Sequence, residues 1–353
     1  MNMNRMLIIS SPFFGYQESV GRAFQELGYD VRIETYDEPI HPFKGLLKWK
    51  HKIACNKEKL RIKSRKKYDK YIREIYNEYN PNIVFSYNGT ILLDNTLDYF
   101  RLKSKVIFWM YDSVLRADRK MCKAHIDHAD AVFCFEEKDV QYYKSINKKA
   151  YFLPLACDSN VYYSINNQEK DIDILFVGQI YGNKKRISLL KKITEQHPNL
   201  NILIYGHYKP YYKNPIKWMF REKRNIFKNV NISPEKVNQL YARTKIALNI
   251  HHEQTLFGAN QRLYEASGSG TYQICDANPY IESVFPNGEI GLYHNEEELF
   301  ACVDDALTND KSVEIKKAQE IILSQHTFLH RVKEMLQVIE ELPQKSIEYL
   351  NYV

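Results

Sequence analysis

Several features that would narrow the function are missing from this 353-residue sequence. It has no run of about 18 apolar residues, so no segment is predicted to span a membrane as a helix. Residues 1–15 contain one arginine and a short apolar run, which we interpret as a first strand and not as a signal peptide. No internal repeat or low-complexity tract stands out, so we expect an ordinary globular chain.

The sequence also lacks the closely spaced cysteines of zinc sites and disulfide-rich domains. Its six cysteines are scattered without a CxxC pair, and several lie in apolar, strand-like segments. This pattern predicts reduced, buried thiols in a cytoplasmic protein. The six are Cys55, Cys122, Cys134, Cys157, Cys275 and Cys302.

A metal-binding pair of aspartates is missing as well. Asp171 and Asp173 formally match a D-x-D pattern, but the metal-binding form follows an apolar strand, whereas this pair precedes one. We therefore predict no metal site and no cofactor. Lysine and arginine side chains and helix dipoles would have to balance the negative charge of any bound phosphate.

The composition and the order of the patterns indicate two α/β domains. Hydrophobic residues make up 44% and charged residues 26% of the chain, which is typical of a globular protein, and the net charge of +7 is modest. A chain of this length fits two domains of roughly 150 residues each. We place the N-terminal domain at residues 1–160 and the C-terminal domain at residues 161–325.

Short apolar runs alternate with helical patterns throughout the chain. Runs that are apolar on both faces favour parallel sheets covered by helices on both sides, hence two Rossmann-like domains that face each other across a cleft. The clearest predicted strands are 6–10, 30–36, 82–88, 105–112, 129–136, 171–179, 200–206, 245–252 and 271–276. The clearest predicted helices are 16–29, 70–81, 137–146, 184–198, 233–244 and the segment from about 316 onward.

Ligands of open parallel sheets bind beyond the carboxyl ends of the strands. The strand that ends at Gly178 is followed by a predicted helix whose first turn carries Lys185 and Arg186. A helix N-terminus attracts anions, and cations placed there oppose the helix dipole, which suggests that a ligand compensates them. We interpret this turn as a diphosphate clamp, with a solvated basic helix start as the alternative.

Histidines follow two other strands of the same half, His207 after one and His251 and His252 after the other. They can hydrogen-bond a substrate, or they can be ordinary loop histidines. Without further ligands at suitable spacing they do not indicate a metal site.

The stretch "NQRLYEASGSGTYQICD", residues 260–276, is a helix that stops at glycines and restarts as a strand. Arg262 and Glu265 share one helix face, and Asn260 lies at the helix start. This arrangement suits a phosphate at Asn260 and Arg262 and a ribose diol at Glu265. The alternative is a surface Arg–Glu pair that contributes a few tenths of a kcal/mol.

This stretch, together with "FPNGEIGLYHNEEELFACVDDAL" and "SQHTFLHRVKEML", resembles the C-terminal domain of glycosyltransferases related to the spore-maturation protein CgeB. Further likeness lies in "ILFVGQIYGNKKRISLL" and, in the N-terminal half, in "VIFWMYDSVLR", "HADAVFCFEEKDVQYY" and "AYFLPLACDSNVYY". The resemblance covers the chain from about residue 82 to residue 331. Each motif is moderately specific, and their order makes the set fairly specific.

The resemblance implies the GT-B fold and transfer of a sugar from a nucleotide-sugar donor, with uridine as the usual base. It implies that Glu265 meets the ribose and that Arg262 and Arg186 lie near the diphosphate. It also implies that the last segment, 326–353, crosses back to the N-terminal domain. Phe257 stands where many related retaining enzymes carry a second glutamate, which leaves the stereochemistry open.

The N-terminal half offers candidates for the acceptor side. Asp112 follows a strongly apolar strand and could serve as the base that takes the acceptor's proton, or it could cap the next helix. Gly15 and Asn88 follow two other strands and are further cleft candidates, although both suit ordinary tight turns.

Two basic segments interleave Lys and Arg with Trp, Phe and Leu, at residues 44–73 and 209–229. Such surfaces fit an anionic membrane, an acidic or lipid-linked acceptor, or a solvated helix face. We expect a glycan, lipid-linked or protein acceptor, with 44–73 as a candidate contact with the inner membrane face. We expect no nucleic-acid partner, because no recognised binding motif accompanies the charge.

Two other functions remain open. A nucleotide-sugar epimerase on the same fold would turn over its substrate without an acceptor. A non-enzymatic binding protein for membranes or nucleic acid would show no nucleotide affinity and would depend on the basic residues of 48–67.

Overall fold

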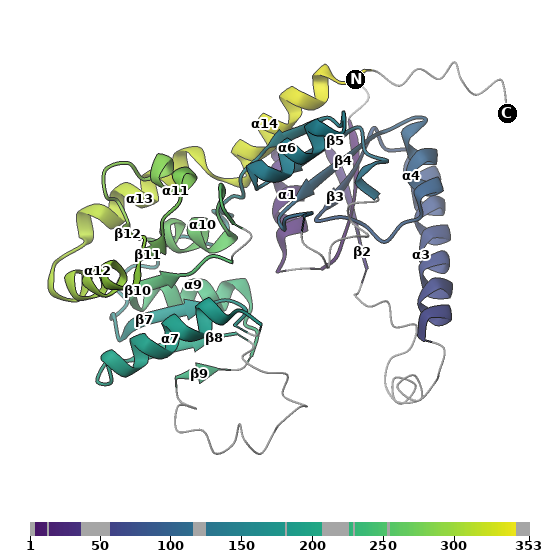
Figure 1. Ribbon diagram of the computed structural model, residues 1–353. Helices are drawn as coiled ribbons and strands as arrows, with labels where there is room; N and C mark the ends of the chain where they lie inside the picture. Colours follow the sequence, from purple (N-terminus) through teal and green to yellow (C-terminus); the bar gives the residue numbers. More distant parts are fainter. Residues whose placement is uncertain are drawn as a thin grey trace, which may run out of the picture. The chain divides into compact units, whose positions relative to one another are not determined.

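The computed structural model describes residues 4–12, 14–36, 57–115, 125–180, 182–206, 226–228, 230–252 and 255–343 (Figure 1). The chain divides into two compact units, which we call unit 1 (residues 1–154 and 328–353) and unit 2 (residues 155–327). Each unit contains a six-stranded sheet in which every strand pair is parallel. The predicted α/β fold class with two Rossmann-like domains is confirmed.

The sheet of unit 1 has the order β2-β1-β3-β4-β5-β6. Its strands are β1 (Arg5–Ser10), β2 (Asp30–Thr35), β3 (Ile83–Tyr87), β4 (Lys105–Met110), β5 (Ala131–Cys134) and β6 (Ala150–Phe152). Its helices are α1 (Tyr16–Glu26), α3 (Lys57–Tyr79), α4 (Asp94–Arg101), α6 (Glu137–Ser145) and α14 (Phe328–Glu341). The first strand begins at Arg5, as the N-terminal apolar run predicts.

Helices cover both faces of this sheet because its central strands are apolar on both sides. On one face, alternate residues of β1, β3, β4 and β5 pack against apolar residues of α3, α4 and α6. On the other face, Phe24 of α1 lies against Phe85, and Phe328 of α14 lies against Trp109, with ring centroids 6.3 and 5.8 Å apart. Helices α1 and α14 lie side by side, although about 300 residues separate them in the chain (Figure 1).

The sheet of unit 2 has the order β12-β11-β10-β7-β8-β9. Its strands are β7 (Ile172–Val177), β8 (Ile202–Tyr205), β9 (Phe227–Lys228), β10 (Thr244–Asn249), β11 (Tyr272–Asp276) and β12 (Gly291–Tyr293). Its helices are α7 (Lys184–Gln196), α9 (Pro234–Ala242), α10 (Gln261–Gly268), α11 (Pro279–Val284), α12 (Glu296–Thr308) and α13 (Ser312–Gln325). Apolar residues of α7 and α12 cover one face of this sheet.

Local sequence signals explain where several of these helices begin. Ser233 caps α9 by accepting a hydrogen bond from the backbone of Lys236, and Pro234 occupies the first helical position. Asn183, Asn260, Asn278 and Asn295 cap α7, α10, α11 and α12 in the same way. The start of each of these helices is therefore fixed by a cap residue that can be read from the sequence.

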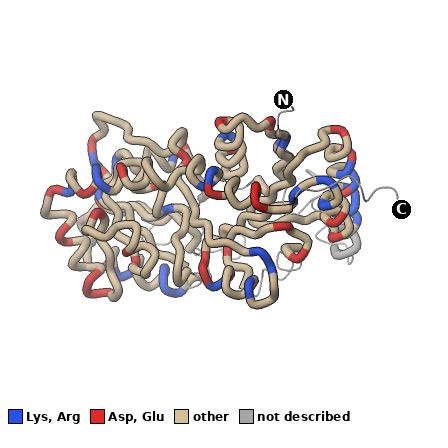
Figure 2. The backbone as a smooth tube through the Cα atoms, turned by 90° about the horizontal axis from the view of Figure 1, so that it is seen from above, with Lys and Arg blue, Asp and Glu red and all other residues tan. Residues whose placement is uncertain are grey.

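Four cysteines fall among the described residues, and all four are free thiols. Cys134, Cys157 and Cys275 are buried, and Cys302 is half-buried, while Cys55 and Cys122 lie outside the described residues. None of the helices in the described ranges combines the length and the hydropathy of a bilayer-spanning segment. Positively and negatively charged residues occur in both units (Figure 2). Residues 37–56 and 207–225, which hold much of the basic segments, lie outside the described residues.

Gly268, at the end of α10, has no room for a side chain. A methyl group at this position would lie 2.4 Å from Sγ of the fully buried Cys157. We predict that Gly268→Ala lowers the free energy of unfolding by about 1–3 kcal/mol, as overpacking does. Urea unfolding measures this loss for Gly268→Ala against the wild type and for Gly268→Ala/Cys157→Ala against Cys157→Ala. If Gly268→Ala lowers the free energy of unfolding as much in the Cys157→Ala background as in the wild type, the contact with the Cys157 sulfur is not the cause.

Candidate functional site

The candidate site of unit 2 lies where β7, β10 and β11 end side by side. These three strands are neighbours in the parallel sheet, so their carboxyl ends meet at one edge. Gly178 follows β7, His251 follows β10, and Asp276 ends β11. Gly178 closely approaches Gly206, where an added methyl group would lie 1.8 Å from the Gly178 carbonyl oxygen, so the backbone alone fits there.

Helix α7 begins at this edge. Its cap, Asn183, accepts a hydrogen bond from the backbone of Arg186 at 3.0 Å. The Arg186 side chain donates to the carbonyl oxygens of Gln179 and Ile250, both at 2.8 Å, and therefore joins the turn after β7 to the turn after β10. Burial lowers the pKa of Arg186 to about 10, so the guanidinium is charged at neutral pH.

Asp276 connects α7 to the ends of β10 and β11. One of its carboxylate oxygens accepts from Lys185 Nζ at 2.8 Å, and the other meets the backbone nitrogen and Nδ1 of His251 at 2.8 and 2.7 Å. Burial alone would raise the pKa of Asp276, but His251 and Lys185 hold it well below its usual range. Asp276 was not among the predicted site residues. The one signal for it in the sequence is its position at the end of an apolar strand.

The same region contains a set of side chains with metal-binding chemistry. The ligand atoms of His251, Cys275 and Asp276 all lie within 4.8 Å of one another. In this structure the His251 and Asp276 atoms are hydrogen-bonded to each other, and the Lys185 ammonium on Asp276 would repel a cation. These contacts favour an ion-pair cluster over a metal centre, and the absence of a metal from the reaction stays a prediction.

Asn260 anchors the start of α10 beside β10. Its side chain accepts from the backbone of Leu263 at 3.3 Å and exchanges hydrogen bonds with Asn249, at 2.7 and 3.1 Å. Asn249 also donates to Gln273 of β11 at 3.0 Å. The predicted helix start at Asn260 is therefore tied to the carboxyl ends of two central strands.

Arg262 and Glu265 form the i,i+3 pair that their spacing allows. Arg262 is 18% exposed and Glu265 is fully buried, so the alternative of a surface pair is wrong. Tyr162 donates a hydrogen bond to Glu265, and Tyr241 accepts one from Arg262. Contact between Glu265 and a ribose would therefore require Arg262 to give up part of this pairing.

Removing one partner of this pair would leave the other as an uncompensated buried charge. We predict that Arg262→Met and Glu265→Leu each lower the free energy of unfolding by about 3–5 kcal/mol. The double variant should lose much less than the sum, because it removes both charges. Urea unfolding of the four proteins gives the coupling energy, and additive losses would contradict a paired, buried arrangement.

In unit 1, two of the three predicted candidates lie together. Asn88 follows β3, Asp112 follows β4, and their side chains and backbone exchange hydrogen bonds at 3.2 and 3.3 Å. Gly15 follows β1 and begins α1 with a positive φ of 75°. The ring of the next residue, Tyr16, lies 6.4 Å from Tyr111 beside Asp112, so all three candidates lie on the carboxyl edge of this sheet.

Asp139 is a second residue that the sequence analysis missed. It is fully buried in the first turn of α6 and accepts from Ser113 Oγ at 2.7 Å and the Val114 backbone at 3.2 Å. Burial raises its pKa to about 6. Asp139 therefore positions the loop directly after Asp112.

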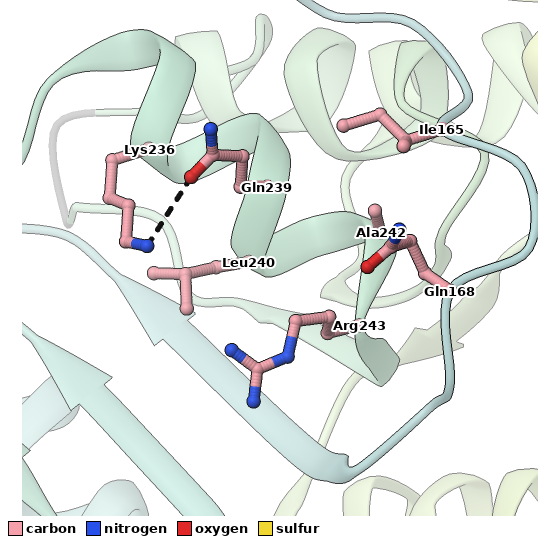
Figure 3. Close-up of a pocket in the computed structure, with 7 residues that line it drawn as sticks. All are labelled: Ile165, Gln168, Lys236, Gln239, Leu240, Ala242 and Arg243. Atoms are coloured by element: carbon pink, nitrogen blue, oxygen red, sulfur yellow. Dashed lines mark hydrogen bonds between the residues drawn. The ribbon is translucent and has the colours of Figure 1, made fainter.

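His207 lies outside the described residues. One pocket of unit 2 lies on the opposite, amino-terminal edge of its sheet (Figure 3). It has a volume of about 330 Å³ and is lined by Ile165, Gln168, Lys236, Gln239, Leu240, Ala242 and Arg243. Lys236 bonds Gln239 at 3.3 Å, and Arg243 pairs with Asp171, so the cations of this pocket are partnered and it contains none of the predicted site residues.

Residues 185–337 match a family model described as "Glycosyl transferase-like". This match covers less than half of the chain and relates that region to glycosyltransferases. The matched region begins in the first turn of α7 and includes Arg186, His251, Arg262, Glu265 and Asp276. No curated protein sequence matches this chain.

Solved structures share the fold of this chain over nearly its whole length. Sucrose-phosphate synthase from Thermosynechococcus elongatus has 14% identity, a TM-score of 0.69, and coverage of 96% of this chain and 99% of that chain. Alr3699/HepE of Anabaena, in complex with UDP and glucose, has 11% identity, a TM-score of 0.63, and coverage of 97% and 100%. A glycosyltransferase from Rickettsia africae has 14% identity, a TM-score of 0.61, and coverage of 98% and 100%. These likenesses show the GT-B fold.

Proposed function

We propose that this protein is a glycosyltransferase that moves a sugar from a nucleotide-sugar donor to a glycan, lipid-linked or protein acceptor, without a divalent metal. The observation that carries this proposal is the convergence of Lys185, Arg186 and the N-terminus of α7 at the carboxyl edge of unit 2. Two cations and a helix dipole in one place suit a diphosphate. The UDP in the Anabaena structure supports uridine as the first base to test.

Each predicted donor residue has a role in this proposal. The glycine backbone at Gly178 allows a phosphate to approach closely, and Lys185 and Arg186 balance the charge of the leaving diphosphate. Asn260 orients the start of α10. Glu265 takes the ribose hydroxyls when the nucleotide loosens its pairing with Arg262, whose guanidinium then turns to the diphosphate.

On the acceptor side, we propose Asp112 as the base that receives the proton of the acceptor hydroxyl. Its hydrogen bonds with Asn88 hold the carboxylate in one orientation, and Asp139 fixes the loop that follows. The basic sequence of α3 within residues 57–73 suits an acceptor at an anionic membrane surface. The order of the motifs supports placement among the CgeB-like glycosyltransferases.

The donor proposal predicts stabilisation by one nucleoside diphosphate in the presence of EDTA. At 100 times its dissociation constant, the nucleotide should stabilise the protein by about 2.7 kcal/mol. A melting-temperature panel of UDP, GDP, ADP, CDP and TDP measures this. The shift should shrink in Arg186→Ala and remain in Arg243→Ala, a matched cation at the opposite edge. No shift with any of the five, or a shift only with added Mg²⁺, would contradict the proposal.

The base proposal predicts a loss of turnover without a loss of donor affinity. Asp112→Asn keeps the size of the side chain but cannot take a proton, so kcat should fall by roughly 100-fold or more. Sugar transfer is measured with sugar donors that carry the stabilising nucleotide and with a panel of acceptors. A parallel reaction contains the donor without an acceptor. Unchanged kcat would remove Asp112 from this role, and conversion of donor without an acceptor would favour the epimerase.

A further inference from the structure

Two buried side-chain nitrogens at the carboxyl edge of unit 2 have no hydrogen-bond partner among the described residues. They are Nδ2 of Asn183 and Nε2 of His251. Asn183 is 4% exposed and His251 is 2% exposed. A buried polar group without a partner costs about 1–3 kcal/mol, and such groups are rare unless a function requires them.

The orientation of Asn183 is fixed by its role as the cap of α7. Its Oδ1 accepts from the backbone of Arg186 at 3.0 Å, which holds the amide against the first turn of this 13-residue helix. Nδ2 belongs to the same planar amide, so it also lies at the helix N-terminus. There it adds a donor to the unpaired backbone N–H groups of the first turn.

The orientation of His251 is fixed by Asp276. One carboxylate oxygen meets both the backbone nitrogen and Nδ1 of His251, at 2.8 and 2.7 Å. Nδ1 is therefore the protonated nitrogen that donates to this oxygen. Because Nδ1 already donates to Asp276, Nε2 donates to an anion only when the ring carries both protons, and the carboxylate then balances the added charge.

A set of contacts links Asn183 and His251 to the first turn of α7. Arg186 is bonded to Asn183 through its backbone and to the carbonyl of Ile250, the residue before His251, through its side chain. Asp276 then joins His251 to Lys185, in the first turn of α7. Asn183, Lys185, Arg186 and His251 thus belong to one linked set of contacts at the start of α7.

We propose that Asn183 and His251 are donor-binding residues that hydrogen-bond the diphosphate of the nucleotide sugar, with Asp276 as the residue that positions His251. This inference rests on the proposed donor function and adds to it the side chains that hold the diphosphate oxygens. Asn183 donates through Nδ2, and His251 donates through Nε2 when its ring carries both protons. Neither residue contacts the base or the ribose.

The test separates diphosphate contacts from nucleoside contacts. Isothermal titration gives dissociation constants for UDP, GDP, ADP, CDP and TDP and for the matching nucleosides. Asn183→Ser keeps an oxygen that caps α7 but lacks the amide donor, and His251→Phe keeps the ring but lacks both nitrogens. Each should weaken the preferred diphosphate by roughly 10-fold or more, as the loss of a hydrogen bond to a charged group does, and leave its nucleoside unchanged.

Asn295→Ser is the matched control for the cap. Asn295 caps α12 by accepting from Glu298 N at 2.9 Å, and its Nδ2 is already bonded to Glu298 Oε1 at 2.7 Å. This variant should bind like the wild type. His251→Gln, which restores a side-chain amide donor, should recover part of the affinity lost in His251→Phe.

The outcomes distinguish this inference from the proposal beneath it. If the wild type binds a diphosphate and both test variants bind it equally well, the assignment of Asn183 and His251 is wrong and the donor function stands. Equal weakening of nucleoside and diphosphate would show a structural role and also overturn the assignment. If the wild type binds none of the five diphosphates, the donor function and this inference both fall.

Discussion

The two-sided contact of Asp276 is the interaction on which the site of unit 2 depends. This buried carboxylate holds Lys185 of α7 on one oxygen and His251 after β10 on the other. Without it, Lys185, Arg186 and the dipole of α7 would repel one another with no internal compensation. Asp276 therefore allows positive charge to gather at one edge of the sheet before any ligand arrives, and its pKa, held well below the usual range, keeps it ionised at neutral pH.

The parallel topology decides where this charge can act. Strands β7, β10 and β11 end at the same edge, so residues from three distant segments converge there. The opposite edge has a pocket that contains none of the candidate site residues (Figure 3). The same rule operates in unit 1, where Asn88 and Asp112 meet beyond β3 and β4. Each unit thus presents its candidate residues at the edge where open parallel sheets bind ligands.

Sequence patterns predicted the strands and the helix starts because those depend on local signals. The apolar runs predicted β7 and β11, the helical pattern over 233–244 predicted α9, and Asn260 was predicted at the start of a helix. The contact between Lys185 and Asp276 could not be predicted, because 91 residues separate them and their meeting depends on strand order. The burial of the Arg262–Glu265 pair was missed for the same reason, since Tyr162 bonds Glu265 and Tyr241 bonds Arg262 from other parts of the chain.

The central claim is that a nucleotide diphosphate binds at the N-terminus of α7, between β7 and β10. A crystal structure with the nucleoside diphosphate that stabilises the protein most tests it directly, in the presence of EDTA. The account predicts phosphate oxygens within hydrogen-bond distance of Lys185 or Arg186 and of the backbone after Gly178. A nucleotide seated in the pocket beside Arg243, or held through a metal ion, would contradict it.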